Sequence, residues 1–140
     1  MAIQRATAEQ AGEAVAILGV LYHRSPATVE RMAAILSNKD FVLLVASDEE
    51  APMGFLHAEL LDRLDGELMM LVYDLEVTAE YRRQGVATEL MQAALDVAHE
   101  QGAARCWLLT ETDNREAREL YDSLDGDTWS AVGFGWTFDT

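Results

Sequence analysis

The stretch LVYDLEVTAEYRRQGVATELMQAAL, residues 71–95, decides the fold of this chain. It opens with an apolar run of β-favouring side chains over residues 71–77, which predicts a buried strand. A turn that contains a glycine follows over residues 82–87. From residue 88 to residue 99 the apolar side chains recur at helical spacing. The stretch therefore predicts a strand, a loop and a helix in that order.

The turn between this strand and this helix has the features of an anion site. The first N–H groups of a helix have no partner inside the helix, and the helix dipole is positive at that end. Arg82 and Arg83 add positive charge, Gly85 has no Cβ that would hold an anion away, and Ala87 is nearly as small. These features predict that the turn binds a phosphate or pyrophosphate. A basic surface turn without a ligand is the alternative that the pattern leaves open.

Length and composition favour one cytoplasmic domain over residues 1–140. No linker, repeat or low-complexity tract divides the chain, and half of its residues are apolar. No apolar run approaches the roughly 18 residues of a membrane span, and the N-terminal residues lack the apolar core of a signal peptide. Cys106 is the single cysteine, and its apolar neighbours indicate a buried strand residue rather than a nucleophile.

The formal net charge of −15 restricts the partners of this protein. A field of that sign repels nucleic acid and anionic membranes, so neither is an expected partner. One interpretation is a cationic substrate steered by acidic walls. The other is surface adaptation, since Lys39 is the only lysine beside nine arginines. The two interpretations are compatible.

Hydrophobic patterns predict the remaining elements. We expect strands at residues 3–7, 41–46, 54–60, 67–77, 105–110 and 129–138, and helices at residues 8–22, 27–37, 88–99 and 114–124. This order predicts an α/β (α+β) fold, with a mixed, mostly antiparallel central sheet and helices on both faces. An apolar terminal strand is an edge that needs cover, which suggests a homodimer. His23 and Arg24 fall between the first two helices, where we favour an ordinary polar turn over a substrate contact.

Two carboxylates interrupt the strand at residues 67–77. Asp74 and Glu76 are two residues apart, so both side chains point to one face. Because burying unpaired carboxylates is costly, we expect the sheet to open there to water or to a cation. One of the two could deprotonate an ammonium, directly or through a water, while the other holds the charged substrate. A structural ion pair, for example with Arg105, is the alternative.

Two motifs carry a resemblance to a known family. Arg82-x-x-Gly85-x-Ala87, after a strand and opening a helix, resembles the acetyl-CoA pyrophosphate loop of the GNAT superfamily of N-acetyltransferases. Asn114-x-x-Ala117-x-x-x-Tyr121 resembles the helix that lies beside the coenzyme arm in that family, and the order of elements is also GNAT-like. The chain departs from the family at residues 125–128, which intervene where members usually continue with Gly-Phe.

The resemblance implies roles for individual residues, with acetyl-CoA as cosubstrate. It implies that Tyr121 is the general acid to the leaving thiolate, and with the carboxylates it makes Asp74, Glu76 and Tyr121 the expected catalytic residues. The residues expected to bind acetyl-CoA are Leu75, Val77, Arg82, Arg83, Gln84, Gly85, Val86, Ala87, Thr88, Asn114 and Ala117. Those expected to bind the acceptor are Asp74, Glu76, His57 and Glu59, with Asp62 as a further pocket candidate. No cluster with metal-ligand spacing occurs, so we expect no metal.

One branch of the family is most similar. Tyr73-Asp74-Leu75, the Arg-Arg-Gln-Gly-Val-Ala-Thr loop at residues 82–88 and the terminal Trp-Thr-Phe-Asp resemble the aminoglycoside 3-N-acetyltransferases of GNAT type. This resemblance implies an antibiotic-resistance enzyme that acetylates a cationic aminoglycoside by direct attack of the amine. A GNAT acetyltransferase acting on a protein, peptide or small metabolite amine is the alternative within the same class. A non-catalytic acyl-CoA-binding domain is the alternative from another class.

Overall fold

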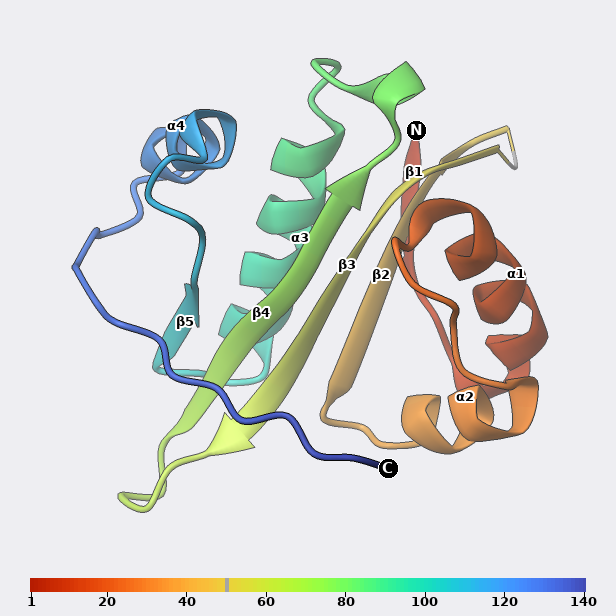
Figure 1. The fold of residues 1–140 in the computed structure, drawn as a ribbon, viewed down its shortest axis with the longest axis horizontal. Coiled ribbons are helices and arrows are strands. Elements are labelled where there is room, and N and C mark those ends of the chain that lie inside the picture. The colour runs from red at the N-terminus through yellow and green to blue at the C-terminus, as the bar shows by residue number, and fades with distance from the viewer. Residues whose placement is uncertain (50) are drawn as a thin grey trace. The chain divides into compact units, whose positions relative to one another are not determined.

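A computed structural model describes residues 1–49 and 51–140 of the chain (Figure 1). These residues form two compact units, Met1–Leu109 and Thr110–Thr140. The first unit contains the sheet and most of the helices, and the second contains one helix and the C-terminal segment. Among the described residues, no helix has both the length and the apolarity to cross a membrane.

The first unit is built on a five-stranded sheet in the order β1-β2-β3-β4-β5. Its strands are β1 (Ala2–Arg5), β2 (Phe41–Asp48), β3 (Ala51–Asp62), β4 (Leu68–Val77) and β5 (Arg105–Leu108). The first three pairings are antiparallel and the last, between β4 and β5, is parallel. The mixed, mostly antiparallel sheet predicted from the sequence is therefore confirmed.

β3 begins earlier than the sequence predicts. Pro52 lies inside the strand and faces Ser47 of β2, although the sequence predicts a strand only from residue 54. The pairing register shifts between Ala46 and Ser47. A bulge of this kind is one of the few places where a sheet tolerates proline, because the ladder is locally interrupted there.

Two helices cover one face of the sheet. α1 (Ala11–Leu21) follows a short 3₁₀ turn, and α2 (Val29–Leu36) begins after Thr28, whose side chain accepts a hydrogen bond from the backbone N–H of Arg31 at 3.1 Å. The buried side chains that share this core are Ala11, Ala14, Leu18, Met32, Leu36, Leu43, Val45 and Phe55. The odd-numbered members on β2 and β3 therefore face α1 and α2.

The third helix, α3 (Val86–Glu100), covers the opposite face (Figure 1). Its buried residues are Val86, Leu90, Met91, Ala94 and Ala98. Close packing here depends on Gly54 of β3, since a Cβ on that residue would lie only 2.7 Å from the backbone oxygen of Glu76 and 3.3 Å from a methyl group of Leu90. In this unit the helices therefore lie on both faces of the sheet, as predicted.

The second unit contains α4 (Arg115–Ser123) and the C-terminal segment. The helix was predicted at residues 114–124, and its boundaries agree within one residue. The strand predicted at residues 129–138 is wrong, because the structure contains no strand there. Val132, Phe134 and Trp136 alternate as a strand requires, but their side chains are exposed. The glycines between them supply no side chain to pack and weaken a strand.

Candidate functional site

The sheet opens at β4. β5 pairs with β4 only from Met69 to Val72, where Val72 faces Leu108. From residue 73 to residue 77, β4 has no strand partner on that side within the described chain, although it stays paired with β3 on the other. Backbone groups that point toward the open side are therefore available to a ligand. Leu75 and Val77, two of the expected acetyl-CoA contacts, lie in this part of β4, where both are half-buried.

A bulge in β4 lies at the start of the open stretch. His57 of β3 faces Asp74, but the next residue, Ala58, faces Val72, so Tyr73 is an extra residue on β4. A bulge bends its strand and re-aims side chains, and bulges are frequent beside active sites. The result here is that Tyr73 and Asp74 both contact the same side chain, His57. No sequence pattern predicted this irregularity.

Asp74 pairs with His57. Nδ1 of the His57 ring lies 3.3 Å from Oδ2 of Asp74, and the two side chains are 22% and 27% exposed. The histidine ring is stacked with Phe41, at 4.5 Å between ring centroids, and with Tyr73, at 5.2 Å. Asp74 is thus held by a side chain that is itself fixed, and it remains partly open to solvent.

Glu76 pairs with the other histidine of this region. Nδ1 of His23, in the connection between α1 and α2, lies 3.2 Å from Oε1 and 3.4 Å from Oε2 of Glu76. These side chains are 54% and 34% exposed, so the pair is much more open than the one at Asp74. Tyr22 anchors the connection by an edge-to-face contact with the buried ring of Phe55. The sequence favoured an ordinary polar turn at His23, and the structure adds a contact between this exposed residue and a candidate site residue.

Both carboxylates lie on one face of β4, as the sequence predicts. Asp74 faces His57 across the sheet and Glu76 faces Phe55, and residues 55 and 57 of β3 share the face covered by α1 and α2. Arg105 was the ion-pair partner considered from the sequence, but the structure pairs each carboxylate with a histidine. Glu59 follows His57 on the same face of β3 and is half-buried.

The loop before α3 has the backbone geometry of an anion site. Gly85 is the residue that precedes α3, with φ of 82°, and Arg83 also has a positive φ of 63°. No side chain caps this helix, so its first N–H groups keep their donors for a ligand. A Cβ at Gly85 would meet no atom within 4 Å, so glycine is required by the backbone conformation rather than by crowding.

Side chains around this loop divide into two groups. Arg82 and Gln84 hydrogen-bond to backbone oxygens, at 3.2 Å to Val77 and 3.2 Å to Glu80, and so brace the loop. Arg83 and Thr88 are exposed. The helix starts two residues before the predicted residue 88, and the Val86 side chain is 1% exposed, so Val86 can offer a ligand only its backbone. Ala87 is half-buried in the first turn.

Asn114 and Tyr121 belong to the second unit. The side-chain oxygen of Asn114 accepts a hydrogen bond from the backbone N–H of Ala117 at 3.1 Å, so the Asn-x-x-Ala spacing forms the N-terminal cap of α4. Tyr121 lies two turns further along the helix. Burial raises the pKa of its phenol above the usual 10, which keeps the hydroxyl protonated at neutral pH.

Two further sequence predictions have an outcome. Cys106 lies in β5, and burial raises its pKa to about 11, so the thiol is protonated at neutral pH and a poor nucleophile, as expected.

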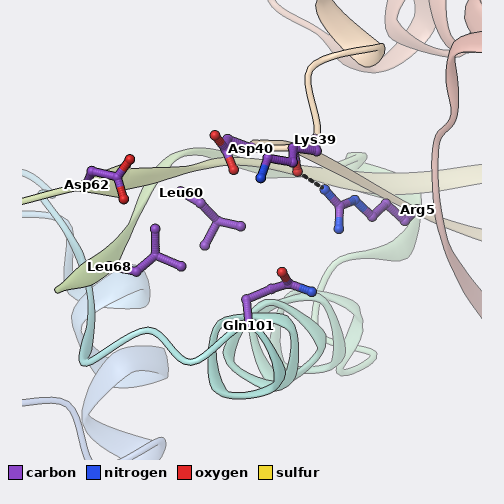
Figure 2. Close-up of a pocket in the computed structure, with 7 residues that line it drawn as sticks. All are labelled: Arg5, Lys39, Asp40, Leu60, Asp62, Leu68 and Gln101. Carbon is purple, nitrogen blue, oxygen red and sulfur yellow. Dashed lines mark hydrogen bonds between the residues drawn. The ribbon is translucent and has the colours of Figure 1, made fainter. Parts of the chain in front are cut away.

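Asp62 lines a cavity of about 490 Å³ together with Arg5, Lys39, Asp40, Leu60, Leu68 and Gln101 (Figure 2). None of the expected catalytic residues lines this cavity. Arg5 in it already donates to the backbone oxygens of Lys39 and Phe41, at 2.9 and 3.1 Å.

The sequence matches one protein-family model. Residues 6–125 match the model described as the acetyltransferase (GNAT) family. Among curated proteins, the chain is 48% identical over 50 residues to N-alpha-acetyltransferase 30 of Schizosaccharomyces pombe, which covers 36% of this chain and 33% of that protein. It is 34% identical over 94 residues to the uncharacterized N-acetyltransferase YhfO of Bacillus subtilis, with coverage of 65% and 62%. The chain thus spans a third to three fifths of the length of these relatives.

Solved structures share the fold. An aminoglycoside acetyltransferase from an uncultured soil metagenomic sample, in complex with sisomicin, superposes with a TM-score of 0.88 at 20% identity, covering 99% of this chain and 96% of that one. A ribosomal-protein-alanine N-acetyltransferase from Brucella melitensis superposes with a TM-score of 0.75 at 19% identity, covering 97% and 100%. At these identities the similarity establishes the fold.

Proposed function

This chain belongs to the GNAT family of acetyltransferases, and we propose that it transfers the acetyl group of acetyl-CoA to an amine of an aminoglycoside, at the 3-N position. Membership of the family confirms the fold class expected from the sequence, the enzyme class of N-acetyltransferase, and acetyl-CoA as the cosubstrate. The acceptor, the modified position and the roles of individual residues are our proposal.

The observation that carries the proposal is the pair of carboxylates beside the opening of the sheet. Asp74 and Glu76 share one face of β4 in the stretch that β5 leaves unpaired. Two partly exposed carboxylates, with a net charge of −15 on the whole chain, favour an acceptor with several positive charges. An aminoglycoside is such a polycation. The structural similarity to aminoglycoside acetyltransferases also supports this acceptor.

The residues around the opening fit acetyl-CoA. The uncapped N-terminus of α3 and the exposed Arg83 would bind the pyrophosphate, and the open edge of β4 at Leu75 and Val77 would hydrogen-bond the pantetheine amides. Bound there, acetyl-CoA supplies the activated acyl group. Backbone N–H groups of the open edge are suited to polarise its carbonyl.

In the proposed mechanism each side chain has one task. Asp74 holds the acceptor ammonium and receives a proton from it, directly or through a water, so that the amine nitrogen can attack. Glu76 binds a second ammonium of the same acceptor. Tyr121, protonated because burial raises its pKa, donates its proton to the departing thiolate sulfur. The chain needs no nucleophile of its own, because the acceptor amine attacks directly.

A peptide N-terminus is the second candidate acceptor. The observation that favours it is the 48% identity over 50 residues to an N-alpha-acetyltransferase. A peptide amine is also a cation when protonated, and the same Asp74 would hold it. It differs from an aminoglycoside in carrying fewer charges, so it makes less use of Glu76.

The proposal is tested by measuring CoA release with acetyl-CoA and a panel of amines: gentamicin-type aminoglycosides, spermidine, lysine and short peptides. Turnover of aminoglycosides at micromolar concentration supports the proposal, and NMR of the product then identifies the acetylated nitrogen. Turnover of peptides alone would establish the second candidate. Binding of acetyl-CoA without turnover of any amine would instead favour a non-catalytic acyl-CoA-binding domain.

Three further expectations belong to this proposal. We propose that the two units act as one acetyltransferase domain, since the family match runs through both. We propose that the protein is a homodimer, because its C-terminal segment presents Phe134 and Trp136 to solvent at 82% and 78% exposure. Antibiotic resistance and a cytoplasmic location follow if aminoglycosides are the acceptors.

A further inference from the structure

We propose that His57 is a positioning residue that acts through Asp74: its Nδ1–H holds Oδ2 of the carboxylate and leaves Oδ1 for the acceptor ammonium. This inference rests on the proposed function, because it assigns a role within the same site. It differs from the direct substrate contact that the sequence suggests for His57.

The bulge in β4 creates the contact. Because Tyr73 is the extra residue, Asp74 stands directly opposite His57, where Cβ atoms of an antiparallel pair are about 5 Å apart. In this arrangement Nδ1 of His57 lies 3.3 Å from Oδ2 of Asp74. This contact uses Oδ2 of Asp74, so in the proposal Oδ1 is the oxygen that takes the acceptor ammonium.

The histidine ring is fixed from two sides. Phe41 lies on β2 and is a diagonal neighbour of His57, with ring planes 26° apart, while Tyr73 lies on β4 with ring planes 25° apart. Since β3 runs between β2 and β4, the two rings reach the imidazole from opposite directions. Stacking of this kind restricts rotation of the imidazole and so preorganises the carboxylate that it holds.

The hydrogen-bond roles of the two ring nitrogens exclude His57 as the base. A carboxylate accepts hydrogen bonds, so Nδ1 must carry the hydrogen in this pair. The base function would then fall to Nε2, but this atom is buried and has no hydrogen-bond partner among the described residues. An acceptor amine cannot reach it without displacing the aromatic neighbours. The proton is therefore received by Asp74, and His57 only orients it.

Glu76 has a more exposed histidine partner than Asp74. The side chain of His23, the partner of Glu76, is 54% exposed, against 22% for His57, the partner of Asp74. His23 also lies in the connection between two helices rather than in a strand. A cationic acceptor can replace His23 at Glu76, because both partners are open to solvent and exposed pairs are weak. It cannot replace His57 at Asp74. The two carboxylates therefore differ: Asp74 is preorganised and Glu76 is exchangeable.

The first test is spectroscopic and does not depend on activity. Long-range ¹⁵N–¹H NMR of the protein, with His23→Asn and His99→Asn for assignment, reports which nitrogen of each imidazole carries the hydrogen. We expect neutral His57 to be the Nδ1–H tautomer, and to lose that preference in Asp74→Leu. An Nε2–H tautomer at His57 in the wild type would overturn the proposal.

The second test uses a matched pair of variants with the best acceptor from the amine panel. The amide N–H₂ of Asn can occupy the place of Nδ1–H, whereas Leu cannot donate, so His57→Asn keeps the contact that His57→Leu removes. We expect His57→Leu to lower kcat at least about tenfold and His57→Asn to stay within about threefold of wild type, with an unchanged pH profile of kcat/KM. Exposed His99→Leu is the control and should be neutral.

The outcomes separate the two proposals. Equal loss in His57→Asn and His57→Leu, with a shifted pH profile in both, would make His57 the base and overturn its positioning role. Wild-type kcat in both variants would overturn it as well. Failure of the wild type to acetylate any amine would refute the proposed function, while the tautomer measurement would still decide the geometry at Asp74.

Discussion

Replacing Asp74 by Asn is the sharpest test of the proposed chemistry. The change is isosteric and removes one negative charge, and the amide oxygen can still accept a hydrogen bond from Nδ1 of His57, 3.3 Å away in the wild type. The amide cannot receive a proton or attract an ammonium as a carboxylate does. The loss therefore falls on the chemical step and on acceptor binding rather than on the fold.

The size of the effect follows from the task. A positioned general base contributes about 10²–10⁴-fold to rate, which corresponds to about 3–5 kcal/mol in the activation free energy. The substitution also affects folding, because it replaces a charge-assisted hydrogen bond by a neutral one. The two side chains that make this bond, Asp74 and His57, are 27% and 22% exposed. We expect the exchange to lower the free energy of unfolding by about 1 kcal/mol or less, which lowers Tm by a few degrees for a chain of this length.

The assay is CoA release with the best acceptor, combined with calorimetric titration of acetyl-CoA. We expect kcat/KM to fall at least about 100-fold, with acetyl-CoA affinity nearly unchanged. Asp65→Asn is the matched control, because it removes the same charge at the turn between β3 and β4, where Asp65 lies 3.2 Å from Arg63 in an exposed pair. Turnover of Asp74→Asn within about threefold of the control would refute the assignment of Asp74 as the base.

Four other changes test separate parts of the site. Tyr121→Phe should lower kcat at least about tenfold with little change in KM. Because burial raises the pKa of Tyr121 above 10, the wild-type rate should show no loss from this group near pH 8, and an alkaline limb there that disappears in the variant would contradict this. Gly85→Ala should lower the free energy of unfolding by about 1 kcal/mol, since a φ of 82° disfavours an L side chain, and should weaken acetyl-CoA binding in titration. Cys106 should react slowly with iodoacetamide at pH 8, since its pKa is about 11, and alkylation as fast as that of free cysteine would show an accessible thiolate. Phe134→Glu combined with Trp136→Glu should convert the proposed dimer to a monomer in analytical ultracentrifugation, and a wild-type monomer would refute the dimer.

Much of this fold could be predicted because its elements are locally encoded. The helix at α3 has helical periodicity on its buried face, and β4 is a continuous β-favouring run. The loop between them carried enough chemistry to predict an anion site, and Gly85 has the positive φ that makes glycine necessary there. The sequence also placed both carboxylates on one face of β4, because that follows from the period of a strand alone.

The remaining features depend on contacts between distant segments, which no local pattern contains. The bulge at Tyr73 is a property of the β3–β4 pairing, so it became visible only with the register. His23 reaches Glu76 across 53 positions of sequence, and without that contact an ordinary turn was the simpler interpretation. At residues 129–138 the local pattern predicted too much: the apolar residues alternate as in a strand, but no strand forms there. Periodicity shows which side chains would share a face, but pairing needs a partner.

Burial, and not residue type, separates the roles that we propose for Asp74 and Glu76. In sequence the two residues are equivalent acids on one strand, and each has a histidine at about 3.2–3.3 Å. His57, the partner of Asp74, is stacked with two aromatic rings of the sheet, so the direction of its Nδ1–H is fixed before a substrate binds. The partner of Glu76 is a loop side chain in water, which an incoming ammonium can replace. A preorganised acid suits proton transfer, whose rate depends on geometry, whereas an exchangeable one suits recognition of acceptors that differ in shape.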